Sequence, residues 1–185
     1  MRPLILVSND DGIQAEGLQV LARAVSGLGR IVVVAPDRQQ SASSHSLTLH
    51  RPLRIVKEGH NRYSVDGTPT DCILLAVHEI LGRKPDLVVS GINLGANLGD
   101  DVHYSGTVSA AIEGGIFGVP SVAFSLAVFN ARRPIWTGAA LYARKIARYL
   151  LEKPVPPGSV LNVNIPNVPR DRIRGPVFTR LGKRN

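Results

Sequence analysis

The stretch LILVSNDDG, residues 4–12, joins a run of apolar side chains directly to a polar turn that holds Asp10 and Asp11. An unbroken apolar run of this length is typical of a strand that is buried on both faces of a parallel sheet. Two adjacent carboxylates repel each other, and in a chain with only 14 acidic residues such a pair needs solvent or a cation beside it. The stretch therefore predicts a central strand that ends in an acidic loop.

Strand-length apolar runs alternate with helix-length segments along the rest of the chain, which indicates repeated strand–helix–strand units. The helix within 67–82 should begin at Thr68, a favoured N-cap residue that is followed by Pro69. We expect strands at 3–8, 30–36, 86–90, 119–126 and 160–166, with helices at 15–27, 67–82, 105–117 and 134–152.

Residues 46–66 interrupt this order, because polar and apolar residues alternate there as they do in an exposed hairpin. We therefore predict a single domain over residues 1–169. Its fold class is α/β, with a Rossmann-like, doubly wound and mostly parallel sheet and a β-hairpin excursion at the sheet edge.

Composition narrows the class of protein further. The net charge is +8, but residues 170–185 hold +5 of it, so we interpret the excess as a basic C-terminal segment and expect no stable nucleic-acid partner. No apolar run is long enough to span a membrane and the start lacks a secretory signal, so we expect a soluble, cytoplasmic protein with no membrane partner. The single cysteine, Cys72, excludes an internal disulfide framework.

Polar loops follow three of the predicted strands on the edge where their carboxyl ends meet, which is where doubly wound sheets bind ligands. Asp10 and Asp11 follow the first strand, Ser41 follows the second, and Asn93 follows the strand at 86–90. Carboxylate, hydroxyl and amide oxygens form a hard site that suits Mg²⁺, Mn²⁺ or Ca²⁺. The alternative is that the two aspartates only cap the first helix and form a turn before Gly12.

A second candidate site lies where the helix at 105–117 begins after a glycine-rich loop. Ser105, Gly106 and Thr107 could hold an anion there with their backbone N–H groups and hydroxyls, although an ordinary N-cap explains the same residues. A cation beside an anion pocket suits hydrolysis of a phosphomonoester by a metal-activated water, in which Asp10 or Asp11 could also orient the water. The sequence contains no P-loop.

Two other phosphate chemistries place acidic residues after the first strand of such a sheet. A covalent aspartyl-phosphate enzyme of the haloacid dehalogenase type needs an Asp-x-Asp motif, which NDDGI lacks. A non-catalytic, receiver-like signalling domain that binds metal and phosphate needs a phosphoacceptor aspartate at the end of its central strand, and the chain has VVSGIN there. The receiver-like domain is the alternative that we keep.

Five segments in this order resemble the survival protein SurE family: LVSNDDGIQAEGLQVLA, VVAPDRQQSASSHSLTL, GTPTDC, DLVVSGINLGANLGDDVHYSGTVSAAIEG and GVPSVAFS. The resemblance covers nearly the whole chain. It implies a Rossmann-like core and a metal-dependent nucleotidase, which is a phosphoric monoester hydrolase that releases phosphate from nucleoside 5′- and 3′-monophosphates. Some members of the family also act on short polyphosphate.

The resemblance also implies roles for particular residues. It gives one divalent metal ion per subunit, Mg²⁺ or Mn²⁺ in solution with Ca²⁺ able to replace it in a crystal. The implied metal ligands are Asp10, Asp11, Ser41 and Asn93, of which Asp10 and Asp11 are also catalytic, and the implied substrate and phosphate contacts are Asn97, Ser105, Gly106 and Thr107. Members form homodimers or homotetramers through C-terminal segments, so we expect residues 170–185 to start an assembly arm.

Overall fold

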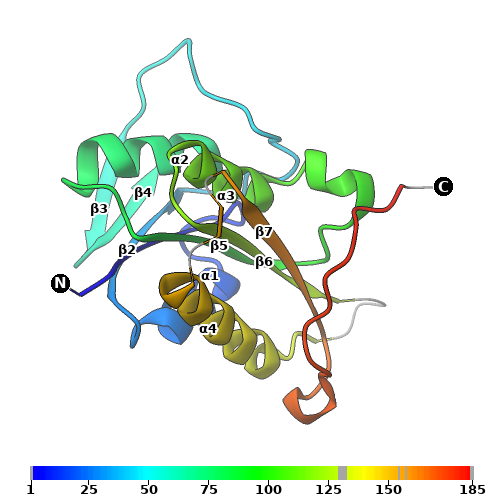
Figure 1. Cartoon of the computed structure of the whole chain (residues 1–185). Helices are drawn as coiled ribbons and strands as arrows, with labels where there is room; N and C mark the ends of the chain where they lie inside the picture. Colours follow the sequence, from blue (N-terminus) through cyan, green and yellow to red (C-terminus); the bar gives the residue numbers. More distant parts are fainter. Residues whose placement is uncertain (1, 129–132, 154, 157, 184–185) are drawn as a thin grey trace.

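The computed structural model describes residues 2–128, 133–153, 155–156 and 158–183. Within these residues seven strands form one sheet in the order β3-β4-β2-β1-β5-β6-β7 (Figure 1). All neighbouring strands are parallel except β3 and β4. The strands are β1 (Leu4–Ser8), β2 (Arg30–Pro36), β3 (Ile55–Gly59), β4 (Arg62–Val65), β5 (Leu87–Leu94), β6 (Ser121–Ala127) and β7 (Val160–Pro166).

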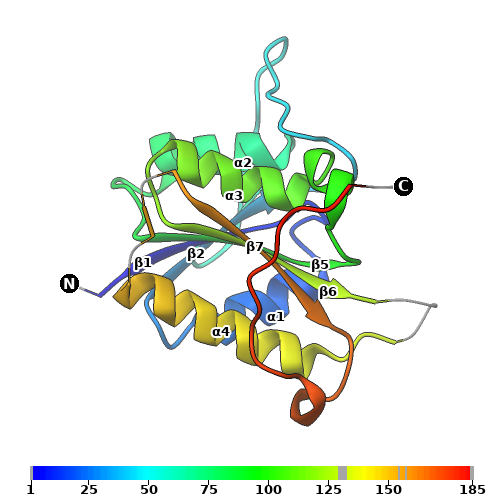
Figure 2. The ribbon, with the colours of Figure 1, turned by 45° about the vertical axis from the view of Figure 1, so that its right-hand side comes forward.

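Helices cover both faces of this sheet, as Figures 1 and 2 show. Helices α1 (Glu16–Val25) and α4 (Trp136–Glu152) lie on one face, and α2 (Pro69–Leu75) and α3 (Gly106–Ile116) lie on the other. Short π- and 3₁₀-helical segments complete the set: η1 (Ala76–Ile80), η2 (Gly99–His103) and η3 (Arg170–Arg172). The predicted Rossmann-like, doubly wound class is confirmed.

Strand β1 supplies side chains to the hydrophobic core on both faces of the sheet. Ile5 and Val7 pack on the side of α1 and α4, whereas Leu4 and Leu6 pack on the side of α2 and α3. All four are 0–1% exposed. A strand covered on both sides has no solvent-facing positions, which explains why its sequence is an unbroken apolar run.

Helix α2 begins at the residue that the sequence indicates. Thr68 is its N-cap and accepts a hydrogen bond from the backbone N–H of Asp71 at 3.1 Å, while the Asp71 carboxylate accepts one from the N–H of Thr68 at 2.8 Å. Such a reciprocal pair is a capping box, which satisfies two N–H groups at the start of the helix. Cys72 is fully buried on this helix.

The prediction for the central strand was too short. Strand β5 extends to Leu94 instead of ending at residue 90, and its pairing with β6 shifts register between Ser90 and Asn93. Gly91 takes a φ of +119° inside this irregularity, a conformation that L side chains rarely adopt. The strand therefore continues through Gly91, the first of the glycines that indicated a loop, and it brings Asn93 to its carboxyl end.

The predicted hairpin excursion lies at the edge of the sheet but is narrower than 46–66. Strands β3 and β4 form the hairpin, and residues 46–54 have no strand structure. The segment that joins β2 to β3, residues 37–54, projects beyond the sheet on the side of α2 (Figure 1). We refer to it as the 37–54 loop.

The C-terminal segment runs along the β7 edge of the molecule and reaches η2 (Figure 2). A methyl group built on Gly99 of η2 would lie 3.3 Å from the carbonyl oxygen of Gly182. Val177, Phe178 and Leu181 are 81%, 93% and 56% exposed in this segment. Residues 184–185 of the predicted basic segment lie outside the described residues. No helix among the described residues is both long and apolar enough to cross a membrane.

Candidate functional site

The candidate site lies at the carboxyl ends of β1 and β5, which are neighbours in the centre of the sheet. The strands that follow β1 in the chain, including β2 and β4, lie on one side of it in the sheet. The next strand, β5, pairs with its other side. In doubly wound sheets such a reversal of strand order leaves a crevice beyond the strand ends, because the connections after the two central strands run to opposite sides. The residues after β1 meet the 37–54 loop and the start of α3 here, because Asp10 is hydrogen-bonded to Gln40 and to Thr107.

Asp10 is the buried member of the acidic pair, with 7% of its surface exposed. Its Oδ1 accepts a hydrogen bond from the Thr107 hydroxyl, and its backbone oxygen accepts one from the N–H of Gln40 at 2.7 Å. Burial raises the pKa of Asp10, and the bond from Thr107 opposes that rise. One residue thus links β1 to both the 37–54 loop and α3.

Asp11 lies nearer to solvent and beside the end of β5. Burial, followed by the charge of Asp10, raises its pKa to about 6, while a hydrogen bond from the backbone of Leu94 opposes the rise. The folded chain therefore holds two carboxylates whose charged forms are unfavourable. A bound cation would reverse this effect, because an opposite charge favours the ionised form of both groups.

Ser41 and Asn93 are each one residue away from a residue that bonds to the acidic pair, and Ser41 follows Gln40, whose N–H donates to the backbone oxygen of Asp10. The Ser41 hydroxyl accepts a hydrogen bond from Gln39 Nε2 at 2.8 Å, and Asn93 Nδ2 donates to the carbonyl of Gly95 at 2.8 Å. Asn93 therefore uses its nitrogen within its own chain segment, and its Oδ1 is left as an acceptor. Asn93 is also next to Leu94, whose backbone binds Asp11.

This oxygen donor set fits a hard divalent cation. No group of three or more His, Cys, Asp or Glu among the described residues could hold a metal, so any centre here must also use hydroxyl or amide oxygens. Two carboxylates with raised pKa values, a serine hydroxyl and an asparagine carbonyl are ligands of the kind that Mg²⁺, Mn²⁺ and Ca²⁺ accept.

The alternative that the aspartates cap the first helix is wrong, because the N-cap of α1 is Ala15 and this helix has no side-chain cap. The turn before Gly12 is present: Gly12 has a φ of +98°, and its carbonyl accepts a hydrogen bond from Asn9 Nδ2 at 3.0 Å across Asp10 and Asp11. Asp10 and Asp11 are therefore not required for the start of this helix.

The start of α3 differs from the prediction in which groups remain for a ligand. The Ser105 hydroxyl accepts a hydrogen bond from the N–H of Val108 at 3.1 Å, so it is an ordinary N-cap, and the Thr107 hydroxyl donates to Asp10. The Thr107 hydroxyl therefore already donates its proton, whereas the Ser105 hydroxyl only accepts in its bond to Val108 and can still donate to an anion. The backbone N–H of Thr107 also bonds the Asp10 carboxylate and opposes the rise of its pKa, so the N–H of Gly106 is the one that remains for a ligand in this turn.

Gly106 allows the first turn of α3 to pack directly against Asp10. A methyl group built at Gly106 would lie 2.7 Å from Asp10 Cβ, 2.9 Å from Ser43 Oγ and 3.1 Å from Asp10 Oδ2. Such separations are too short for a side chain, so only glycine permits this approach without a shift. The start of α3 and the acidic pair thus form one site.

Asn97 is held by strands β6 and β7, on the β7 side of the sheet, rather than by the acidic pair. Its Nδ2 donates to Ser125 Oγ of β6 at 2.8 Å, and its backbone is held by Asn164 and Asn162 of β7. The described contacts thus place Asn97 at the carboxyl ends of β6 and β7, with 8% of its surface exposed. The sequence did not indicate these three partners.

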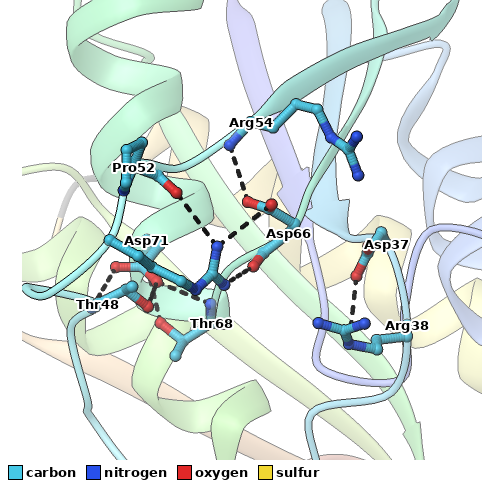
Figure 3. Close-up of polar contacts among 9 residues, drawn as sticks. Asp37, Arg38, Thr48, Pro52, Arg54, Asp66, Thr68 and Asp71 are labelled. Atoms are coloured by element: carbon cyan, nitrogen blue, oxygen red, sulfur yellow. Dashed lines mark hydrogen bonds and ion pairs between the residues drawn. The ribbon is translucent and has the colours of Figure 1, made fainter.

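Two buried carboxylates hold the 37–54 loop in place, and sequence reasoning missed both roles. The Asp71 carboxylate accepts hydrogen bonds from the N–H and hydroxyl of Thr48 at 3.0 and 2.7 Å, in addition to its bond from Thr68 (Figure 3). Glu113 of α3 pairs with His45 Nε2 at 2.8 Å. The capping-box spacing from Thr68 to Asp71 was a usable signal for the first anchor.

The fold and the site define a Rossmann-like α/β protein with an acidic pair and a helix N-terminus at its switch point. The chain belongs to the survival protein SurE family, whose profile matches residues 5–185.

Individual proteins show the same relationship. The chain is 55% identical to a protein of Geotalea daltonii named 5′-nucleotidase SurE, over 98% of this chain and 73% of that protein. It is 49% identical to the 5′-nucleotidase SurE of Geobacter sulfurreducens, over 98% of this chain and 69% of that protein. The crystal structure of the SurE protein from Aquifex aeolicus superposes with a TM-score of 0.93 at 47% identity, over 98% of this chain and 73% of that one. The family resemblance read from the sequence is confirmed.

Proposed function

We propose that this chain is a divalent-metal-dependent nucleotidase that hydrolyses the phosphomonoester of nucleoside 5′- and 3′-monophosphates to nucleoside and phosphate. Its relatives in Geotalea daltonii and Geobacter sulfurreducens bear the name 5′-nucleotidase SurE, which supports a phosphoric monoester hydrolase. The observation that carries the proposal is the contact between Asp10 and Thr107, because it joins an acidic pair to a helix N-terminus.

In this proposal Asp10, Asp11, Ser41 and Asn93 hold one divalent cation, Mg²⁺ or Mn²⁺. When bound, the cation polarises a phosphoryl oxygen and lowers the pKa of a nearby water. Asp11 is the more exposed of the two aspartates, so its carboxylate is the one that orients the attacking water. Asp10 is held by Thr107 and keeps the acidic pair aligned with α3.

The phosphate is bound at the start of α3 in this proposal. The Gly106 N–H and the Ser105 hydroxyl donate to phosphoryl oxygens at the positive end of the helix dipole, and Thr107 holds Asp10 beside them. The Ser105 oxygen also caps the helix and so fixes the direction of its first N–H groups. Asn97 is held at β6 and β7, from where it contacts the nucleoside part. A short polyphosphate presents the same terminal group, so we include it as a side activity.

The receiver-like alternative has less support. Such a domain needs an aspartate at the end of the central strand, and β5 ends in Asn93 and Leu94. It also would not explain the similarity to relatives named as nucleotidases over 98% of this chain.

The proposal extends to domain organisation, assembly and location. Residues 1–169 form a single nucleotidase domain, and residues 170–185 start an arm through which two or four copies associate. The exposed Val177, Phe178 and Leu181 support this role, because apolar side chains gathered on one segment favour association. A cytoplasmic location stays a prediction from the sequence.

A substrate panel tests the proposal. Protein treated with EDTA is assayed for phosphate release from AMP, GMP and 3′-AMP, alone and with Mg²⁺, Mn²⁺ or Ca²⁺. We expect no activity without a cation, restored activity with Mg²⁺ or Mn²⁺, and loss in Asp11→Ala but not in the matched variant Asp66→Ala, whose carboxylate lies at the hairpin edge (Figure 3). Undiminished activity of the EDTA-treated protein or of Asp11→Ala would contradict it.

A further inference from the structure

Ser43 has a hydroxyl that the fold does not use. Its Oγ is buried, and it has no hydrogen-bond partner among the described residues. Buried polar groups in native proteins are almost always paired, because an unpaired one loses its bonds to water without replacement. An orphaned hydroxyl beside a ligand site therefore suggests that the ligand supplies the missing partner.

The position of Ser43 within the site is fixed by Gly106. A methyl group built on Gly106 would lie 2.9 Å from Ser43 Oγ and 3.1 Å from Asp10 Oδ2. The two oxygens are therefore at most about 6 Å apart, on the side of the α3 start that faces the acidic pair. Ser43 thus adds a donor at the place where the Thr107 hydroxyl already donates to Asp10.

The backbone around Ser43 is held in an unusual shape. Ala42 and Ser44, on either side of it, have φ values of 55° and 50°, a conformation that is unfavourable for residues with a side chain. The N–H of Ser44 donates to the carbonyl of Tyr104 at 3.3 Å, and Ser46 Oγ donates to the carbonyl of Ser43 at 2.7 Å. Such conformations persist where surrounding contacts hold them, and they concentrate at functional sites.

The anchors of the 37–54 loop also limit how far Ser43 can move. His45, two residues later, pairs with the buried Glu113 of α3 at 2.8 Å. Thr48 is held by Asp71 (Figure 3). Ser43 itself contacts the start of α3, and two buried carboxylates hold the residues that follow it. Its hydroxyl is therefore presented in a defined position.

We propose that Ser43 is a substrate-binding residue whose hydroxyl donates a hydrogen bond to a phosphoryl oxygen of the substrate, beside the N–H group of Gly106. This inference rests on the nucleotidase function proposed above. A phosphoryl oxygen is the partner that fits, because the hydroxyl lies at a helix N-terminus, where negative charge is favoured.

The test compares Ser43→Ala with the neighbouring variant Ser44→Ala, in the presence of the most active cation. We expect Ser43→Ala to lower kcat/KM for AMP by about ten- to a hundredfold, which is typical for loss of a hydrogen bond to a charged group. The inhibition constant of inorganic phosphate should rise by a similar factor, whereas inhibition by adenosine, which has no phosphate, should not change. Ser44→Ala should behave like wild type in all three measurements.

A structural role for the hydroxyl would give a different pattern. If Ser43 only binds a buried water that holds the loop, Ser43→Ala will lower the melting temperature of the ligand-free protein and leave the phosphate inhibition constant unchanged, and this result overturns the proposal. We expect the ligand-free melting temperature to stay the same or rise, because an unpaired buried group is removed.

The proposal and the nucleotidase function fail separately. If wild type hydrolyses no nucleotide with any cation, the proposed function is wrong, and phosphate binding still tests Ser43 through the rise in melting temperature that phosphate causes. Loss of that rise in Ser43→Ala supports the contact, and an equal rise in both proteins overturns it. If wild type is active and Ser43→Ala is equally active, only the role of Ser43 is wrong.

Discussion

Replacing Asp11 by asparagine should make the metal-free protein more stable, even though it removes a proposed ligand. Burial, followed by the charge of Asp10, raises the pKa of Asp11 from 3.8 to about 6 in the folded chain. Between these values the folded state binds a proton that the unfolded state has released. The free energy of unfolding therefore falls as the pH rises from about 4 to about 6, and the whole penalty is present above that range.

The size of this penalty follows from the shift. A shift of about two pKa units corresponds to about 3 kcal/mol. Asp11 is only partly buried, so screening by solvent reduces this value, and we take about half of it, roughly 1.5 kcal/mol. Asparagine cannot ionise, so Asp11→Asn should gain this amount at pH 8 and about a third of it at pH 4.5.

Urea unfolding in EDTA measures the difference. The fluorescence of Trp136, the single tryptophan, follows the transition at pH 4.5 and at pH 8. Asp66→Asn is a control with the opposite expected effect on the free energy of unfolding, because hydrogen bonds from the Arg54 backbone and the Arg51 side chain lower the pKa of Asp66. It should destabilise the protein at both pH values. A gain in Asp11→Asn that is equal at both pH values, or a loss at pH 8, would refute the reasoning.

Three further predictions concern the metal, α3 and the loop anchor. Saturating Mg²⁺ should reverse the order of stability, because a ligand at 100 times its Kd adds about 2.7 kcal/mol to wild type and nothing to Asp11→Asn; thermal unfolding with and without Mg²⁺ checks this. Gly106→Ala should lower kcat/KM for AMP by about a hundredfold, because its methyl group displaces Asp10, whereas Gly59→Ala, where a methyl group meets nothing within 4 Å, should retain activity in the same assay. Thr68→Ala should lower the free energy of unfolding by about 1–2 kcal/mol in urea titrations, because it removes the N-cap of α2 and a bond to the carbonyl of Ser46, and an equal effect in Thr179→Ala would contradict this cause.

Features that depend on neighbours in sequence were predictable. The apolar run of β1 and the start of α2 at Thr68 follow from burial on two faces and from capping, and both are where the sequence indicates. The same apolar run placed Asp10 and Asp11 after β1, whereas the family resemblance implied their role as metal ligands. The acidic pair was predictable because it directly follows a recognisable strand.

Features that depend on distant contacts were not predictable from one sequence. The extension of β5 through Gly91 depends on pairing with β6, which no local pattern reveals. The Thr107 hydroxyl is engaged by Asp10, 97 residues away, so its availability could not be judged from the helix start alone. The unused hydroxyl of Ser43 is likewise visible only once α3 packs on the 37–54 loop.

The Asp71 carboxylate has a consequence for how this protein opens. Because the same group bonds the amide of Thr48 and the first turn of α2, neither can exchange its protected proton with solvent unless that carboxylate is released. The edge of the crevice and the second helix should therefore belong to one cooperative unit in hydrogen exchange. A nucleotide that slows exchange at Thr48 should slow it at Thr68 as well, so this helix reports on occupancy without touching the substrate.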